Sequence, residues 1–177
     1  FQVIVRDLGS DREEDITGDQ RYYHMGARFS PDGERVAFTS NRSGRPAQLH
    51  VYEWGSIREV TRWDDPVFYF NWLSGKELVY VKGWYNTEVR LVNIEDGVDS
   101  LLLHFEEAET FIGGVDRSSR RVLFTSNVGG WSDIGEVEVD KGGWRWVYRS
   151  SSEKWFPEYF GDGVLFIEYS QGRNWLK

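Results

Sequence analysis

The sequence repeats itself with a nearly constant period. The clearest copy reads Arg28-Phe29-Ser30-Pro31-Asp32-Gly33-Glu34-Arg35-Val36-Ala37-Phe38-Thr39-Ser40, and weaker copies cover residues 70–80, 115–126 and 159–166. The equivalent apolar positions lie 42, 44 and 42 residues apart, at Val36, Leu78, Val122 and Val164. A period in the low forties restricts the chain to repeat architectures in which each repeat is one supersecondary unit.

Each repeat is built for β-strands. Apolar and polar residues alternate along most of the chain, and no window keeps the spacing of an amphipathic helix. Gly and Asp-Gly separate short runs rich in Val, Ile, Tyr, Phe and Trp, and in the first full repeat these runs are residues 24–30, 35–41, 48–54 and 57–63. We therefore predict an all-β chain, a β-propeller or an arc of one, made of four-stranded antiparallel blades of about 43 residues.

The repeats divide residues 1–177 as a single propeller region with incomplete ends. We predict a half blade at 1–17 with the third and fourth strands, and a half blade at 153–177 with the first and second. Between them lie three full blades, at 22–63, 67–105 and 110–150. Either the halves combine and close a four-bladed ring, which removes exposed strand edges, or the chain is an arc of a larger propeller. Trp175-Leu176-Lys177, which suggest the start of a third strand, favour the arc.

The string from Ala27 to Arg42, with its Ser-Pro-Asp-Gly turn, followed by Gln48-Leu49-His50-Val51-Tyr52, resembles the blade repeat of TolB-type propellers. The same repeat occurs in the N-terminal propellers of prolyl oligopeptidase-family serine peptidases, such as acylaminoacyl peptidases and dipeptidyl peptidases, and in tricorn protease. The other blades have lost this turn and match by period and strand pattern. The motif is a fold signal, because Pro31 presets φ, Asp32 bonds the backbone locally and Gly33 accepts a positive φ.

Composition excludes several classes of partner. The net charge is −8 and the isoelectric point is near 5.0, so we expect neither nucleic acid nor membrane as a partner. There is no Cys, which excludes a disulfide framework. No signal peptide is visible at Phe1-Gln2-Val3-Ile4-Val5, so we expect a cytoplasmic protein, although the chain begins without Met.

The residues of a catalytic centre are missing from this sequence. A serine peptidase of the resembled family needs Gly-x-Ser-x-Gly followed by Asp and His, and the sequence contains no such motif. Its three histidines, His24, His50 and His104, have no metal-ligand spacing, and no phosphate-cradling glycine loop is present. We therefore expect no catalytic residues, no cofactor and no metal site in this chain, and whether the parent protein is an enzyme stays open.

One face of the blades collects the candidate binding residues. In a four-stranded blade, the connections before the first strand and between the second and third strands emerge on the same face. Aromatic and acidic residues gather in these connections, and exposed aromatics are typical of interfaces. The alternative is that Trp side chains such as Trp63, Trp84 and Trp131 pack between blades. The candidate ligand or partner face consists of Tyr22, Tyr23, His24, Trp84, Tyr85, Glu106, Glu107, Trp131 and Trp155.

The resemblance also gives this acidic face a specific meaning. Dipeptidyl peptidases hold the N-terminal amine of a substrate with two adjacent propeller glutamates. Two such pairs occur here, Glu13-Glu14 and Glu106-Glu107, although the surrounding residues differ from that family's motif. Glu13-Glu14 falls on the opposite face as a solvated pair, which leaves Glu106-Glu107 as the candidate.

Taken together, the resemblance implies the propeller portion of a prolyl oligopeptidase-like serine peptidase. Such a propeller gates and docks peptide substrates for a C-terminal α/β-hydrolase domain, absent from this chain, in the same parent protein. Two alternatives stay open: a TolB-like non-enzymatic propeller that binds a protein partner, and a stand-alone four-bladed propeller that binds a ligand. A cut arc would also expose blade edges, so a homo-oligomer is a further expectation.

Overall fold

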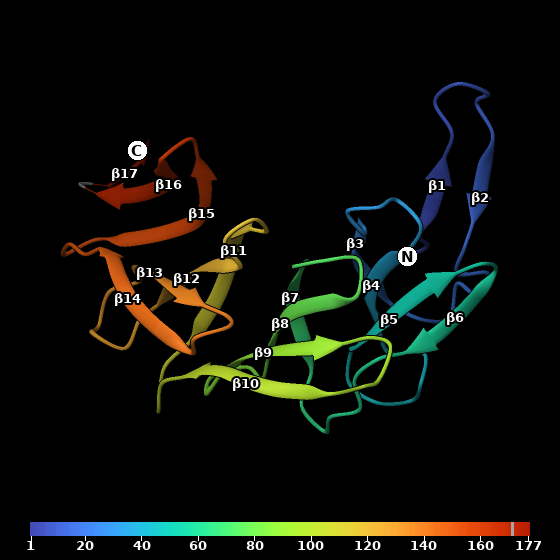
Figure 1. Ribbon diagram of the computed structural model, residues 1–177, viewed down its shortest axis with the longest axis horizontal. Helices are drawn as coiled ribbons and strands as arrows, with labels where there is room; N and C mark the ends of the chain where they lie inside the picture. Colours follow the sequence, from blue (N-terminus) through green and yellow to red (C-terminus); the bar gives the residue numbers. More distant parts are fainter. Residues whose placement is uncertain (171) are drawn as a thin grey trace. The chain divides into compact units, whose positions relative to one another are not determined.

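The computed structural model describes residues 1–170 and 172–177, and it consists of antiparallel β-sheets joined by turns (Figure 1). The all-β prediction is therefore confirmed. The chain forms two compact units, residues 1–68 and 69–177. In the part of the chain that the structure describes, no helix is long and apolar enough to cross a membrane.

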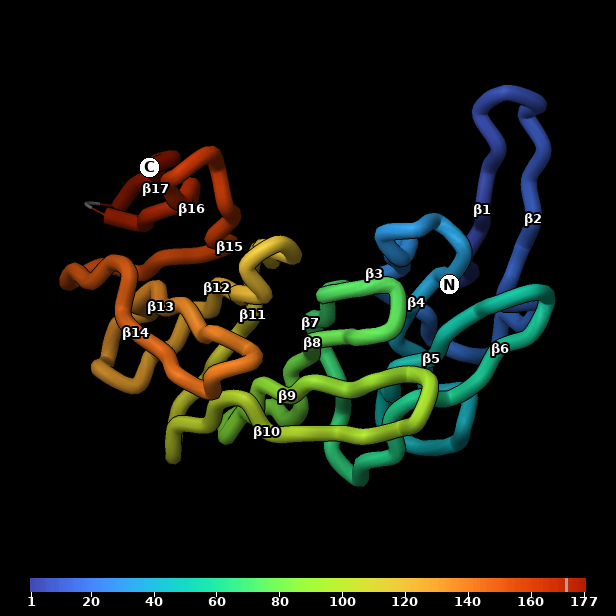
Figure 2. Tube along the Cα trace, viewed as in Figure 1, coloured from blue at the N-terminus to red at the C-terminus, as the bar shows by residue number. Residues whose placement is uncertain are grey.

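The first unit contains a two-stranded hairpin and a four-stranded blade. The hairpin pairs β1 (Ile4–Arg6) with β2 (Glu13–Asp15), and its long connecting loop is visible in the dark blue part of Figure 2. The blade has the order β3-β4-β5-β6, with bounds His24–Phe29, Val36–Ser40, Gln48–Glu53 and Ser56–Glu59. Buried Val3 and Ile16 of the hairpin segment pack on Val36 and Phe38 of β4, so one small core joins hairpin and blade.

The Ser-Pro-Asp-Gly turn closes the β3–β4 hairpin as its residues dictate. The Gly33 N–H donates to the Ser30 carbonyl at 2.9 Å, and Gly33 adopts a φ of 78°, which glycine accepts without strain. The Asp32 carboxylate accepts the Glu34 N–H at 3.1 Å, and Ser30 Oγ accepts the Arg35 N–H at 3.0 Å. The side chains of Ser30 and Asp32 are therefore used within the turn, which supports a structural role.

The second unit, which begins within β7, contains two four-stranded sheets and one three-stranded sheet. The first sheet has the order β7 (Val67–Trp72), β8 (Glu77–Lys82), β9 (Glu88–Asn93) and β10 (Asp99–His104). The second has β11 (Thr110–Asp116), β12 (Arg121–Ser126), β13 (Asp133–Glu138) and β14 (Gly143–Tyr148). The third has β15 (Glu153–Phe160), β16 (Gly163–Ser170) and β17 (Arg173–Leu176), so a full third strand stands where the sequence suggested only its beginning.

First strands of three sheets carry the same irregularity. The register shifts between Met25 and Arg28 in β3, between Ile112 and Val115 in β11, and between Trp155 and Glu158 in β15. A β-bulge bends the strand and increases its twist. In β11 the bulge also brings neighbouring blades together, because a Cβ on Gly113 would lie 2.2 Å from the Pro157 carbonyl oxygen.

Apolar side chains between successive blades form the core of the second unit. Val81 and Val89 of the first sheet pack in one cluster with Val122, Phe124 and Val137 of the second. A further cluster joins Leu123 and Ile134 of the second sheet to Phe166 of the third. The apolar faces of neighbouring sheets are therefore buried against each other. The loops at the ends of the strands lie outside these contacts, and binding sites can form there.

Candidate functional site

The predicted face is divided between the two units. Tyr22, Tyr23 and His24 lie in the first unit, where the Tyr23 N–H donates to Asn41 Oδ1 at 2.8 Å. Tyr23 is exposed and Tyr22 half-buried, whereas His24 is only 4% exposed. The His24 ring packs edge-on against Phe38, at 5.6 Å between centroids, so His24 does not present its side chain to solvent.

Buried His24 and His50 lie on either side of Phe38. The His50 ring stacks on Phe38 at 5.9 Å, and His50 Nδ1 lies 3.0 Å from the Gln48 carbonyl oxygen. Burial lowers the pKa of both histidines, and the nearby charge of Arg42 lowers both further. Both imidazoles are therefore neutral near pH 7, which is the form that a core position favours.

The other predicted residues lie in the second unit, most of them in connections between strands. We call these connections the loop row: residues 83–87, 105–109, 127–132 and 149–152. The loop row contains Trp84, Tyr85, Glu106, Glu107 and Trp131, while Trp155 follows it within β15.

Hydrogen bonds join each connection of the loop row to the next. Asn86 Oδ1 accepts the Glu107 N–H at 3.1 Å, and Asn127 Oδ1 accepts the Glu109 N–H at 2.8 Å. The Ser132 N–H donates to Glu153 Oε2 at 3.2 Å, at the start of β15. These bonds link the loop of Trp84 and Tyr85 to the loop of Glu106 and Glu107, and that loop to the loop of Trp131.

The predicted aromatic residues at the loop row are open to solvent. Tyr85 is 80% exposed and Trp84 64% exposed, and Trp131 and Trp155 are about half exposed, so neither Trp84 nor Trp131 is enclosed between blades. Glu107 has a φ of 56°, which is uncommon for a residue with a side chain. Within the described residues, neither Glu106 nor Glu107 forms an ion pair, so both carboxylates are available to a ligand.

Beneath the last connection lies a buried ion pair. Lys154 is 0% exposed, and its Nζ donates to Asp133 Oδ1 at 3.1 Å, to the Ser150 carbonyl at 2.8 Å and to the Ser152 carbonyl at 2.5 Å. Burial would raise the pKa of Asp133, but hydrogen bonds from Arg149 and Lys154 outweigh it and lower the pKa. All three donors of Lys154 are used, so this pair holds the base of the loop row.

The second unit also contains a groove that sequence reasoning missed. The groove is a cavity of about 730 Å³ between the β11–β14 and β15–β17 sheets, and turns 116–118 and 161–163 contribute to its lining. At its polar side, the carboxylate of Glu136 accepts from Arg121, Arg145 and Tyr159, with the Tyr159 hydroxyl at 2.9 Å. Burial, together with the hydrogen bond to Glu136, raises the pKa of Tyr159 well above its usual range.

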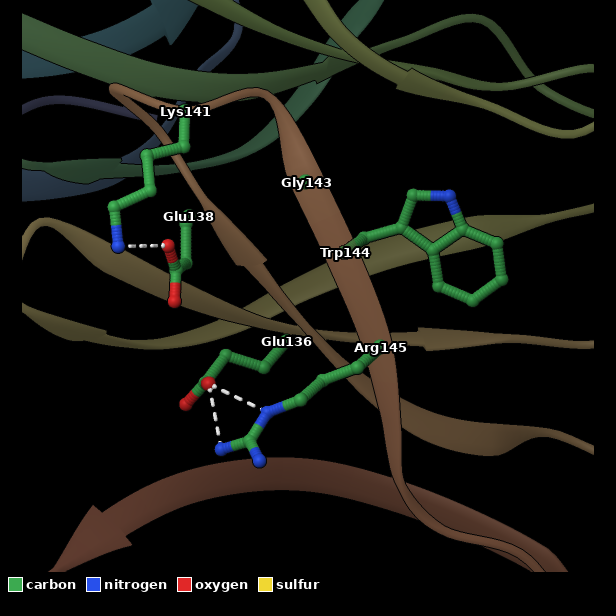
Figure 3. Close-up of a pocket in the computed structure, with 6 residues that line it drawn as sticks. All are labelled: Glu136, Glu138, Lys141, Gly143, Trp144 and Arg145. Carbon is green, nitrogen blue, oxygen red and sulfur yellow. Dashed lines mark hydrogen bonds and ion pairs between the residues drawn. The ribbon is translucent and has the colours of Figure 1, made fainter.

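A smaller cavity of about 270 Å³ shares Glu136 and Arg145 with the groove (Figure 3). Figure 3 shows Arg145 turned toward Glu136, while the Trp144 ring extends to the other side of β14. One signal in the sequence could have indicated the contact between Glu136 and Arg145. The two residues lie opposite each other in the register of β13 and β14. Alternation alone could not reveal that the neighbouring β15–β16 hairpin completes the cavity. Across the described residues, no group of His, Asp and Glu is arranged to hold a metal ion.

Comparison with solved structures defines the class of fold, which is a β-propeller. TolB from Acinetobacter baumannii aligns with 99% of this chain at a TM-score of 0.75 and 14% identity. A puromycin-hydrolyzing peptidase from Mycobacterium tuberculosis aligns with 94% at a TM-score of 0.72 and 17% identity, and an oligogalacturonate lyase in complex with manganese with 99% at 0.74 and 13% identity. The chain has the TolB-type β-propeller fold, and this prediction from the blade repeat is confirmed.

Sequence identities of 13–17% support a common fold and nothing beyond it. This chain spans 45% of the TolB structure, 32% of the peptidase and 56% of the lyase. No protein-family model matches the sequence, and no curated protein matches it.

Proposed function

We propose that this chain is part of the propeller of a prolyl oligopeptidase-like serine peptidase, of the acylaminoacyl peptidase or dipeptidyl peptidase-like kind. In this proposal the loop row docks and gates peptide substrates for a hydrolase domain outside this chain. The observation that carries it is that the loop of the exposed Trp84 and Tyr85 is joined by Asn86 to the loop of Glu106 and Glu107, whose carboxylates form no ion pair with the described residues. The likeness to the puromycin-hydrolyzing peptidase supports the fold of such a domain.

The chemistry of the loop row suits a peptide with a free amino terminus. Exposed aromatic rings gain large contact area at little entropic cost when a chain lies across them. Two adjacent carboxylates attract an ammonium group, and Asn86 fixes the backbone of Glu107 through its N–H. A peptide bound in this way would present its amino terminus to Glu106 and Glu107 and its side chains to Trp84 and Tyr85.

Fluorescence anisotropy with peptides labelled at the carboxyl end tests this docking. We expect a peptide with a free amino terminus to bind several-fold more tightly than its acetylated form. Combined substitution Tyr85→Ala and Trp131→Ala should abolish binding while the β-rich circular dichroism is unchanged. Trp54→Ala is the matched control, because Trp54 is 81% exposed but lies in the turn between β5 and β6. Equal binding of the free and acetylated peptides would contradict the proposal. So would a loss of binding on Trp54→Ala as large as that caused by the combined substitution of Tyr85 and Trp131.

A separate experiment tests whether catalysis belongs to a hydrolase domain outside this chain. The purified chain should be inert toward peptide and ester substrates, since it lacks a nucleophile motif. The native polypeptide should react with a fluorophosphonate probe that labels activated serines. Robust hydrolysis by the purified chain would contradict the proposed role.

A second candidate is a TolB-like propeller that binds a protein partner without any hydrolase domain. The alignment with TolB over 99% of this chain favours it. Intact mass and fluorophosphonate labelling of the native polypeptide separate the two candidates. A native protein that carries no reactive serine, yet loses a partner when Tyr85 and Trp131 are replaced, would favour the TolB-like role.

A further inference from the structure

The groove between the β11–β14 and β15–β17 sheets has a size and lining typical of a small-molecule site. Its volume of about 730 Å³ falls within the ~300–1,000 Å³ of ligand pockets. Apolar groups come from both sheets, with Val147 and Tyr148 on β14 and Val164 and Phe166 on β16. The Tyr148 and Phe166 rings lie 4.9 Å apart, so they form one continuous aromatic wall.

Glu136 organises the polar side of the groove but is not itself open to a ligand. Its side chain is 5% exposed, and its two oxygens accept from Arg145 Nε and Nη2, Arg121 Nη1 and the Tyr159 hydroxyl. A carboxylate with this many donors is already satisfied. Glu136 therefore fixes the positions of the arginines around it.

The unused hydrogen-bond donors of the groove include guanidinium groups, while the exposed carboxylate of Asp162 in the same lining can only accept. Arg117 bonds through Nε to the Trp72 carbonyl at 3.1 Å, and within the described residues its two Nη atoms have no partner. Arg145 uses Nε and Nη2 on Glu136, which leaves Nη1. Since guanidinium groups only donate, a ligand head group must accept. A carboxylate is the organic acceptor that suits free guanidinium donors, and it would bind at Arg117 and Arg145, away from Asp162.

We propose that this groove binds an organic carboxylate with an apolar body. The carboxylate would contact Arg117 and Arg145, and the apolar part would lie against Val147, Tyr148 and Phe166. A free aromatic or aliphatic acid and the C-terminal residue of a peptide both carry this chemistry. The groove is separate from the loop row, so the inference does not rest on the proposed docking function.

Titration of the purified chain with 3-phenylpropionate tests the inference, with amide chemical shifts as the readout. Gly161 and Gly163 line the groove, and their amides should shift in a saturable manner. N-acetylphenylalanine should bind similarly, whereas N-acetylphenylalanine amide, which lacks the charge, should bind at least ten-fold more weakly. Binding of 3-phenylpropionate alone would identify a free acid, and binding of peptides ending in phenylalanine would identify a chain terminus.

Three variants of groove residues and one control variant make the test specific. Arg117→Gln removes an exposed donor and should weaken binding several-fold, and Val147→Glu places a carboxylate in the groove and should abolish it. Arg145→Gln should also weaken binding, but it removes hydrogen bonds to Glu136. If Arg145→Gln fails to fold, Arg117→Gln still tests the inference. Arg12→Gln, in the loop between β1 and β2, changes the net charge equally and should have no effect. Absence of saturable shifts, equal binding of the amide, or unchanged binding by both groove variants would overturn the inference.

Discussion

Arg120 and Glu77 lie 43 residues apart and form a bidentate ion pair, with Arg120 Nη1 and Nη2 each 2.8 Å from a carboxylate oxygen of Glu77. The separation matches one repeat, so the pair connects two neighbouring blades. The hydrogen bonds from Arg120 lower the pKa of Glu77 despite its partial burial. Two parallel bonds fix the relative position of the partners better than a single contact.

A double-mutant cycle should detect this connection between blades. The side chains of Arg120 and Glu77 are 29% and 20% exposed, so solvent screening reduces the coupling, and we expect about 0.5–1 kcal/mol for Arg120→Gln with Glu77→Gln. Urea unfolding measures each variant. The exposed pair Lys141 and Glu138 is the control and should show clearly weaker coupling. Coupling no stronger than in that pair would mean that the blades do not depend on this contact.

Gly135 lies in β13 at a position where any side chain would clash with a neighbouring ring. A Cβ at Gly135 would lie 2.1 Å from Cζ of Phe124, a ring buried in the core between blades. We expect Gly135→Ala to lower the free energy of unfolding by about 3 kcal/mol, because the packed ring has no space to move.

Gly143, at the start of β14, is the matched control for this substitution. No atom lies within 4 Å of its added Cβ, so Gly143→Ala should be neutral or stabilise by about 0.5 kcal/mol. Similar unfolding midpoints for Gly135→Ala and Gly143→Ala would argue against steric exclusion by Phe124.

Sequence reasoning predicted the fold because the repeat is local. Each hairpin is encoded by alternation and by turns such as Pro31-Asp32-Gly33, so strand positions follow directly from the residues. The connections that hold Trp84, Tyr85, Glu106 and Glu107 also followed from strand order.

Long-range contacts were outside the reach of this reasoning. His24 was expected on the binding face, but its ring packs against Phe38, and His24 is the one buried residue of β3, whose other five residues are exposed. The groove depends on Arg117, Glu136 and Tyr159 from three different strands or turns, and no motif relates such residues in one sequence.

Lys154 should be indispensable to the packing beneath the loop row. Lys154→Met removes a cation from Asp133 while Asp133 stays buried, and an unpaired buried charge costs about 3–5 kcal/mol. Arg149 still contacts Asp133 at 2.9 Å, so the loss should fall at the lower end of this range. Arg149→Ala should cost less than Lys154→Met, because the Arg149 side chain is largely exposed. Thermal unfolding of both variants provides the comparison, and the reverse order would show that Arg149 is the main partner of Asp133.

The stability of the first unit should decrease in mildly acidic solution. Burial lowers the pKa of His24 and His50 below the usual 6.5, so below that pH the unfolded chain takes up protons that the folded chain does not. The contribution of the two neutral histidines to stability is therefore fully present above about pH 7. It falls as the pH decreases below the pKa that these histidines have in the unfolded chain. Arg42 opposes protonation of both rings, whereas Asp15 near His24 and Glu59 near His50 partly favour it.

Hydrogen exchange at about pH 7.5 and about pH 5.5 can resolve this effect for each unit. After correction for intrinsic rates, amides of β4 and β5 should lose protection at the lower pH, while those of β12 and β13 should change little. The second unit contains one histidine, His104, which is exposed. Aspartates with lowered pKa values titrate near or below pH 4 and do not contribute in this range. Replacing both His24 and His50 by Gln should remove the pH dependence, and an unchanged dependence in that variant would assign it to other groups.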